Sequence, residues 1–423
     1  MLVLQTIREN PEKIVTLLAI KNFDGKEIIQ TIISLDDKRK ETQKMLDDNL
    51  AESNSLAREI GHLFKTGKTE EANKLKERTS ELKELAKELS AAFELTKKEL
   101  EDVLLKVPNL PHPSIPPGKT PEDNEIVLTE GAIPLLPDSA LPHWDLAAKY
   151  DLIDFALGNK IAGAGFPVYK GKGARIQRAL INFFLDRAIE QGYKEIQPPY
   201  LVNAASGYGT GQLPDKDGQM YYAPLDDLYL IPTAEVPVTN IYRDVILKES
   251  DFPRKNVAYS SCFRREAGSY GKDVRGLNRL HQFDKVEIVQ ISHPDKSYAI
   301  LEEMVTYVTS LLRALELPFR ILKLCGGDMS FTSAMTYDME VYSAAQKRWL
   351  EVSSISNFES YQANRMKLRY KDDSGKMQLA HTLNGSALAL PRIVAALLEN
   401  NQTENGIKIP EALVPYTGFK MID

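Results

Sequence analysis

Cysteine is scarce in this chain, which contains only Cys262 and Cys325 among its 423 residues. The two lie far apart and form no C-x-x-C pair, which argues against a disulfide framework and against a thiolate zinc site. No apolar run reaches the length that a membrane span needs. The N-terminus also lacks a basic region followed by a sustained apolar segment. We therefore expect a cytoplasmic protein with no membrane contact and no zinc.

Two common nucleotide-binding signatures are missing as well. No G-x-G-x-x-G opens a helix and no P-loop is present, which argues against a Rossmann or Walker site. The net charge of −6 argues only weakly against nucleic acid, because a phosphate backbone responds to local patches of charge. Between Arg58 and Arg78 basic residues slightly outnumber acidic ones, so an RNA partner is permitted but not demonstrated.

Proline is absent from about Glu27 to Lys106, and glycine occurs there only at Gly61 and Gly67. A heptad pattern with a polar break around 65–68 predicts two long antiparallel helices, each roughly 55 Å long at 1.5 Å per residue. On the residues alone this hairpin is either a dimerisation coiled coil or an arm that contacts a large partner. Its predicted seam consists of Ile28, Ile32, Leu35, Arg39, Thr42, Leu46, Asn49, Ser53, Leu56, Ile60 and Leu63, then Leu75, Leu82, Leu85, Leu89, Ala92 and Val103.

Many prolines interrupt the chain between Val107 and Asn124 and cannot continue a helix or a central strand. We therefore expect an arm at 1–108, a linker at 109–124 and a second domain at 125–423. In that domain strands and helices mix without strict βαβ alternation, which predicts an α+β fold with an antiparallel sheet flanked by helices. The expected strands are 196–202, 220–224, 228–233, 257–266, 281–291, 319–325, 336–344 and 348–356, and the expected helices are 176–191, 294–315 and 391–400.

The segment from Ser261 to Glu287 is the most informative part of the second domain. Arg264 and Arg265 end an apolar run beside Glu266, a Gly-rich charged loop follows, and a returning strand carries Phe283 and Glu287. Guanidinium groups pair with phosphate oxygens, and a flat ring can stack on a base. Strand alternation places Phe283 and Glu287 on one face. The hairpin is thus either a nucleotide clamp or an ordinary surface hairpin with salt bridges.

Three further segments accompany the hairpin. Thr233-Ala234-Glu235 is a loop whose carboxylate and hydroxyl suit an ammonium group. In the strand Glu351-Val352-Ser353-Ser354, alternation predicts that Glu351 and Ser353 share a face. A run of small residues then leads through Pro391 and Arg392 into a helix.

These segments, in this order, resemble the conserved motifs of class II aminoacyl-tRNA synthetases in the form found in seryl-tRNA synthetases. The hairpin resembles motif 2, the segment from Thr382 to Arg392 resembles motif 3, and the segment around Pro198 weakly resembles motif 1, which builds the dimer interface in that family. The resemblance covers nearly the whole chain. It implies a homodimeric serine–tRNA ligase that uses ATP and Mg²⁺, forms seryl-adenylate from L-serine, and binds tRNA(Ser) through the N-terminal arm. It also allows tRNA(Sec) as a substrate.

The resemblance assigns roles residue by residue. Arg264 is expected at the α-phosphate and the substrate carboxylate, Phe283 against the adenine, Arg392 at the γ-phosphate and Glu351 at ATP and its Mg²⁺. Glu287 is expected to accept the serine hydroxyl. The remaining assignments are ATP binding by Arg265, Glu266, Val352, Ser353 and Ser354, and serine binding by Thr233, Ala234, Glu235, Asn384 and Ser386.

The chain departs from the family pattern at two positions, since Ala387 and Pro391 stand where many relatives have glycine. Proline is well tolerated in a first helical turn, whereas Ala387 must allow a close approach of the backbone. His281 and His381 are interpreted as structural. Two alternatives stay open: a class II ligase for threonine or proline, and a paralogue that charges a carrier protein or only binds RNA.

Overall fold

A computed structural model describes residues 1–215, 218–266 and 275–423. It divides into two compact units. The arm unit comprises residues 2–19 and 23–108, and the sheet unit comprises Met1, residues 20–22 and residues 109–423. No helix within these described residues is long and apolar enough to cross a membrane.

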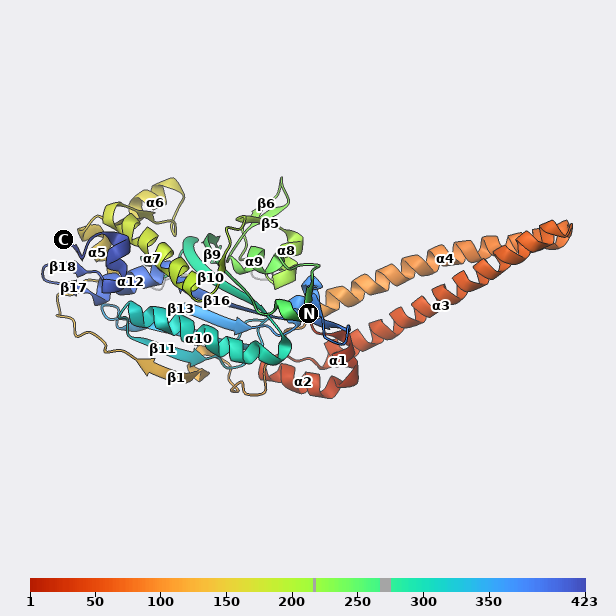
Figure 1. Cartoon of the computed structure of the whole chain (residues 1–423), viewed down its shortest axis with the longest axis horizontal. Helices are drawn as coiled ribbons and strands as arrows, with labels where there is room; N and C mark the ends of the chain where they lie inside the picture. Colours follow the sequence, from red (N-terminus) through yellow and green to blue (C-terminus); the bar gives the residue numbers. More distant parts are fainter. Residues whose placement is uncertain (216–217, 267–274) are drawn as a thin grey trace. The chain divides into compact units, whose positions relative to one another are not determined.

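The arm unit is dominated by two long helices, α3 (Lys26–Lys65) and α4 (Thr69–Leu104), which pack side by side along their length (Figure 1). Two short helices, α1 (Leu4–Glu9) and α2 (Pro11–Ile20), precede them. Gly67 has a φ of +79° in the turn between α3 and α4, a conformation that glycine adopts without steric cost. The predicted pair of long helices with a break at 65–68 is confirmed.

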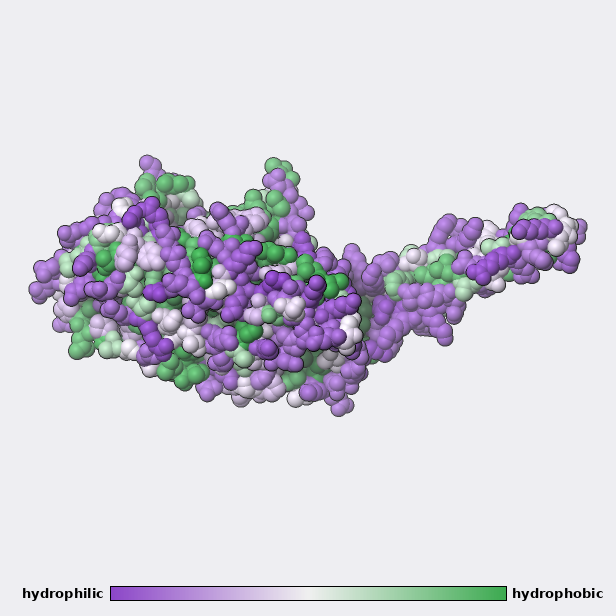
Figure 2. All heavy atoms as spheres, viewed as in Figure 1, coloured by the Kyte–Doolittle hydropathy of each residue, from purple (hydrophilic) through white to green (hydrophobic). Residues whose placement is uncertain are grey.

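The seam between the long helices follows the prediction in α3 but not throughout α4. Every predicted α3 seam position is at least half-buried, whereas Leu85 is 41% exposed and Ala92 is exposed. Ala86 and Phe93 take their places, because the step that follows Leu82 is four residues and not three. The outer surface of the arm is mainly hydrophilic (Figure 2).

A buried carboxylate supports the base of the arm. Asp36 is fully buried in α3 and pairs with Arg8 of α1 at 2.9 Å, with Arg39 at 2.7 Å and with Lys40 at 3.0 Å. Burial alone would raise the pKa of Asp36, but the hydrogen bonds from Arg39 and Lys40 outweigh it and lower the pKa. The heptad pattern gives no sign of this group.

The sheet unit is built on one eight-stranded sheet with the order β1-β11-β12-β13-β16-β10-β9-β4. Neighbouring strands are antiparallel except for the parallel pair β4 and β9. The predicted antiparallel sheet is therefore confirmed. Its strands are β1 (Glu125–Glu130), β4 (Lys194–Glu195), β9 (Arg254–Phe263), β10 (Gln282–Ser292), β11 (Phe319–Lys323), β12 (Met335–Ser343), β13 (Arg348–Asn357) and β16 (His381–Ala389).

Helices cover one face of this sheet, and three of them supply much of the main core. These are α7 (Gly171–Glu190), α10 (Ser297–Ala314) and α12 (Leu390–Asn400), with Pro391 in the first turn of α12 as expected. Ala387, one of the departures from the family pattern, is fully buried in the same core. Because alternate residues of a strand point to opposite faces, Lys285 and Glu287 of β10 face away from the core side, where Val286 and Ile288 lie.

Smaller elements surround the sheet. A second apolar cluster holds α9 (Glu235–Asn240) and α11 (Tyr361–Met366) against the other face through Val289 and Ile291. The other helices are α5 (His143–Lys149), α6 (Phe155–Ile161), α8 (Ala204–Thr210), α13 (Val414–Thr417) and the 3₁₀ turns η1 (Pro121–Asp123), η2 (Glu249–Asp251), η4 (Pro294–Lys296) and η5 (Glu411–Leu413). The short strands are β2 (Ile153–Asp154), β3 (Val168–Tyr169), β5 (Leu201–Asn203), β6 (Tyr222–Ala223), β7 (Leu228–Leu230), β8 (Ile246–Lys248), β14 (Arg369–Lys371), β15 (Met377–Leu379), β17 (Gln402–Thr403), β18 (Gly406–Lys408) and β19 (Met421–Ile422).

Several expected strands differ in extent, including those at 228–233 and 319–325, which end at Leu230 and Lys323. Of the strand expected at 196–202 only residues 201–202 are in a strand, the start of β5, because Pro198 and Pro199 cannot donate to a ladder; β4 ends at Glu195, before the expected range. The strand expected at 257–266 ends at Phe263, so Arg264 lies just beyond it. The β1 strand was not expected.

Candidate active site

A buried carboxylate lies at the centre of the sheet face opposite the main core, which we call the open face. Glu287 of β10 is 1% exposed and accepts hydrogen bonds from Thr233 Oγ1 at 3.1 Å and Asn384 Nδ2 at 2.9 Å. Lys285 Nζ lies 2.5 Å from Oε2 of the same carboxylate. Ser386 is the Cα partner of Glu287 across β10 and β16. The structure thus brings together Thr233, Glu287, Asn384 and Ser386, which are far apart in the sequence.

A second buried carboxylate, Glu235, lies at the start of α9. It accepts a hydrogen bond from Gln362 Nε2 at 2.7 Å, and its backbone N–H donates to Thr233 Oγ1 at 3.2 Å. Burial, and then the nearby charge of Glu287, raise the pKa of Glu235 to about 7. Ala234, which precedes it, is fully buried. The loop therefore presents a carboxyl group that changes charge near neutral pH.

Arg264 and Phe283 lie against one another. The guanidinium carbon of Arg264 is 5.2 Å from the centre of the Phe283 ring, and Arg264 Nε donates to the Pro232 carbonyl at 3.3 Å. A cation and an aromatic ring are therefore held side by side next to the Thr233 loop. This places together the two groups expected at the phosphate and the base.

The side chains of Arg265 and Glu266 contact other residues than Arg264 and Phe283 do. Arg265 Nε donates to the Met220 carbonyl at 3.1 Å, and its guanidinium carbon lies 4.6 Å from the centre of the Tyr221 ring. Glu266 accepts a hydrogen bond from Arg279 at 2.8 Å. The remainder of the predicted hairpin loop, residues 267–274, lies outside the described residues. His281 hydrogen-bonds the Arg264 carbonyl at 3.0 Å, in keeping with the structural role expected of it.

A bulge in β13 changes which residues accompany Glu351. Glu351 pairs with Glu340 of β12, but Ser353 pairs with Met339, so Val352 is an extra residue in the ladder. The prediction that Glu351 and Ser353 share a face is therefore wrong, and Ser354 takes that position. Ser353 is instead buried and donates a hydrogen bond of 2.6 Å to the Ser386 carbonyl.

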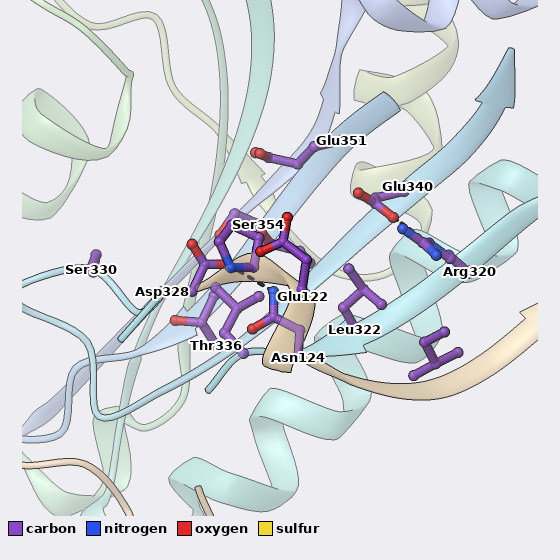
Figure 3. A pocket seen from close by; sticks show the side chains of 14 residues that line it. Glu122, Asn124, Arg320, Leu322, Asp328, Ser330, Thr336, Glu340, Glu351 and Ser354 are labelled. Carbon is purple, nitrogen blue, oxygen red and sulfur yellow. Dashed lines mark hydrogen bonds and ion pairs between the residues drawn. The ribbon is translucent and has the colours of Figure 1, made fainter. Parts of the chain in front are cut away.

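Glu351 and Ser354 line a pocket of about 660 Å³ on the open face of the sheet (Figure 3). Arg320 pairs with Glu340 at one side of the pocket, and Asn124 donates to Asp328 at 2.7 Å. The other lining residues are Pro121, Glu122, Ile126, Leu322, Leu324, Ser330, Thr336 and Asp338. Carboxylates thus outnumber cations around the pocket.

Arg392 connects this pocket to the hairpin. Its Nη1 donates to the Glu351 carbonyl at 2.6 Å, and its Nε donates to the Asn278 carbonyl at 3.2 Å. The Arg392 guanidinium also lies 3.9 Å from the Glu351 carboxylate. Arg392 and Glu351 are therefore adjacent, while Phe283 and Glu287 lie on β10 of the same sheet and Arg264 lies just beyond the end of β9.

Sequence reasoning missed Lys285 and Gln362, which contact the two buried carboxylates. A signal existed for Lys285, because strand alternation places it on one face with Phe283 and Glu287. No local signal marks Gln362. It is fully buried and reaches Glu235 only because α11 packs beside α9.

Comparison with known proteins decides the family of this chain. A family model of the class II tRNA synthetase core domain (G, H, P, S and T) matches residues 222–401, and one of the seryl-tRNA synthetase N-terminal domain matches residues 1–111. The serine–tRNA ligase of Salinibacter ruber is 52% identical over 100% of this chain and 99% of its own length. The chain belongs to the seryl-tRNA synthetase family.

Solved structures agree with this assignment. The seryl-tRNA synthetase of Pyrococcus horikoshii, crystallised with ATP, has a TM-score of 0.92 and 34% identity over 100% of this chain and 99% of its own. The cytoplasmic serine–tRNA ligase of Naegleria fowleri, in complex with AMP, has a TM-score of 0.88 and 26% identity over 100% and 99%. The predicted seryl-tRNA synthetase fold is confirmed, as is the ATP-dependent aminoacyl-tRNA ligase class. The family decides against the threonine and proline alternatives.

Proposed function

We propose that this seryl-tRNA synthetase activates L-serine with ATP and transfers the seryl group to the 3′ end of tRNA(Ser). The observation that carries the choice of serine is the buried carboxylate of Glu287. An ionised carboxylate offers about four lone-pair positions, and Thr233, Lys285 and Asn384 occupy three of them. Among the residues that the structure describes, these partners leave one acceptor position for a hydroxyl.

The remaining acceptor position on Glu287 explains why serine would be selected over other small amino acids. Alanine and glycine have no hydroxyl to donate, so their binding leaves a buried acceptor without its partner. Threonine has the hydroxyl but adds a methyl group that must fit beside Thr233, Asn384 and Ser386, which are all buried. Glu235 suits the α-ammonium group, which needs acceptors in place of the water that it loses on binding.

The reaction requires no protein nucleophile. The serine carboxylate attacks the α-phosphate of ATP, pyrophosphate leaves, and a terminal ribose hydroxyl of the tRNA then takes the seryl group from seryl-adenylate. The protein contributes positioning and charge neutralisation. Arg264 and Arg392 carry that charge in the proposal, and the Phe283 ring holds the adenine.

The pocket that adjoins Glu351 suits a hard divalent cation. The described residues contain no cluster of three or more His, Cys, Asp or Glu side chains able to hold a metal by themselves. Glu351 and Ser354 would therefore share Mg²⁺ with phosphate oxygens, which fits its preference for a few carboxylate ligands together with substrate phosphates. Bound there, Mg²⁺ supplies further neutralisation of phosphate charge.

The wider assignments follow the family. We assign tRNA(Ser) binding to the arm formed by α3 and α4, whose exposed lysines at its turn include Lys65, Lys68 and Lys76. We also assign a homodimer that forms through the segment around Pro198, between β4 and β5, and a cytoplasmic location. The arm would accept tRNA(Sec) if that tRNA presents the same features as tRNA(Ser).

Amino-acid-dependent exchange between ATP and labelled pyrophosphate, measured with each of the twenty amino acids, tests the activation step. Serine is expected to support exchange far above the rest. Exchange with threonine and not serine would overturn the substrate, and exchange with none would overturn the enzymatic assignment. Charging of unfractionated tRNA with serine then tests the transfer step.

A further inference from the structure

A buried histidine and carboxylate lie behind the active-site face, in contact with the hairpin. His143 at the start of α5 and Glu399 near the end of α12 are both completely buried. His143 Nδ1 lies 2.7 Å from Glu399 Oε1, and the His143 backbone N–H donates to the same oxygen at 2.9 Å. Neither residue contacts the predicted serine or ATP groups directly.

The other ring nitrogen of His143 accepts a hydrogen bond from the hairpin. The backbone N–H of Leu277 donates to His143 Nε2 at 2.8 Å. Nε2 must therefore carry the lone pair, which places the ring proton on Nδ1 and directs it to Glu399. Burial alone would raise the pKa of Glu399, but hydrogen bonds from His143 and Ser343 outweigh it and lower the pKa. The carboxylate thus stays ionised and fixes the tautomer.

The neighbouring residues fit this contact closely. Gly276 has a φ of +67°, and a Cβ built on it would lie 2.2 Å from His143 Nε2. The guanidinium carbon of Arg275 lies 4.6 Å from the centre of the Trp144 ring. Residues 275–278 lead back to β10 and are called here the returning limb of the hairpin. Three consecutive residues of this limb, 275–277, therefore contact the beginning of α5.

The next residue leads to the ATP site. Asn278 donates from its side chain to Gln346 at 2.9 Å, and Gln346 in turn donates to Glu399 at 3.0 Å. The Asn278 carbonyl accepts from Arg392, whose other nitrogen donates to the Glu351 carbonyl. Glu399 and Arg392 both belong to α12, so one helix holds Leu277 through His143 and Asn278 through Arg392.

We propose that His143 is a positioning residue for ATP: with Glu399 it fixes the returning limb at Leu277 and Asn278, and this holds Arg392 beside Glu351. The proposal rests on the proposed function. A purely structural role in the core is the alternative. The two differ in which ring nitrogen matters, since the structural role needs Nδ1 towards Glu399 and the positioning role needs Nε2 towards Leu277.

Two substitutions of His143 distinguish the role of its Nδ1 from the role of its Nε2. In His143→Asn the amide can still donate to Glu399 in the place of Nδ1, but nothing reaches Leu277. In His143→Gln the longer side chain can offer an acceptor in the place of Nε2. His381→Asn and His381→Gln are the matched controls, because His381 is hydrogen-bonded to Ser297 and lies away from the hairpin.

Pyrophosphate exchange with serine supplies the kinetic readout, and thermal unfolding shows whether each variant is folded. We expect His143→Asn to raise the KM for ATP about tenfold while the KM for serine stays within about twofold, since Thr233 and Glu287 are untouched. His143→Gln should restore the KM for ATP to within about threefold of the wild-type value. Faster hydrogen exchange at the Leu277 amide in His143→Asn alone would show the lost anchor directly.

Equal KM values for ATP in the two folded His143 variants would overturn the proposal, as would a wild-type KM in both. Gly276→Ala keeps the inference testable if His143→Asn does not fold, because it displaces the limb from outside the core and should also raise the KM for ATP. An unchanged KM in folded Gly276→Ala would likewise contradict the proposal. Loss of exchange by the wild-type chain would instead count against the proposed function.

Discussion

Glu351 and Ser354 lie on one face of β13 although they are three residues apart, because Val352 is bulged out of the ladder with β12. Ser353, two residues from Glu351, lies on the other face and hydrogen-bonds the Ser386 carbonyl. The two adjacent serines therefore have different environments. One faces the proposed metal and phosphate site, and the other ties β13 to β16.

Substituting each serine with alanine should separate these roles. Ser354→Ala is expected to raise the Mg²⁺ concentration needed for half-maximal pyrophosphate exchange several-fold, with little change in the melting temperature. Ser353→Ala should lower the free energy of unfolding by about 1 kcal/mol through loss of a buried hydrogen bond, with the Mg²⁺ dependence unchanged. Each variant is the control for the other, and the reverse pattern would contradict the assignment.

Glu235 should make serine use depend on pH. Its raised pKa of about 7 means that the free enzyme carries a neutral carboxyl below that pH and a carboxylate above it. Because the α-ammonium group of serine needs the carboxylate, kcat/KM for serine should fall about tenfold per pH unit below about pH 7. The KM for ATP should not follow this profile.

Glu235→Gln keeps the shape of the side chain and removes its charge, so it should lower kcat/KM for serine and flatten the profile between about pH 6 and 8. Glu404→Gln, at an exposed position, is the control and should keep the wild-type profile. A Glu235→Gln variant that retains the wild-type pH dependence would show that another group titrates.

Asp36 should stabilise the arm through charge. Asp36→Asn keeps the size of the side chain but leaves Arg8, Arg39 and Lys40 without their carboxylate. We expect a loss of about 1–3 kcal/mol in the free energy of unfolding of the arm, less than for a fully buried pair because the cations are partly exposed. Urea unfolding followed by circular dichroism measures this, with exposed Asp48→Asn as the control.

The pH dependence of that contribution has a definite sign. The pKa of Asp36 is lowered in the folded chain, so its stabilisation is fully present above the unfolded value of about 4 and is lost as the pH falls through the lower folded value. Asp36→Asn should therefore unfold with a weaker acid dependence. The same acid sensitivity in both proteins would argue against an ion pair at this position.

The long helices and the main strands could be predicted because their signals are local. Freedom from proline and a heptad spacing define α3 and α4, and alternating apolar runs define strands such as β10. The prediction for the α4 seam was wrong at Leu85. From Leu82, a step of three residues leads to Leu85 and a step of four leads to Ala86, and the sequence pattern allows either. Only the facing helix decides between them.

The placement of candidate residues could be predicted where chemistry and strand alternation coincide, as at Phe283 and Glu287 of β10. The placement could not be predicted where a strand departs from simple alternation. The bulge at Val352 has no signature in the sequence, and it moves Ser354 into the position expected for Ser353. Contacts made only by packing were also invisible. Gln362 contacts Glu235 from α11, and His143 contacts the Leu277 backbone from α5, and no sequence pattern connects either helix to these partners.

The central claim is that Glu287 reads the serine hydroxyl, and serine-over-alanine discrimination in pyrophosphate exchange tests it most directly. A site that hydrogen-bonds a substrate hydroxyl can reject the analogue that lacks it by roughly 10⁴–10⁵. Glu287→Ala should lower kcat/KM for serine by at least about a hundredfold and change that for alanine far less, while Glu404→Ala leaves both unchanged. Undiminished preference for serine in a folded Glu287→Ala variant would contradict the account.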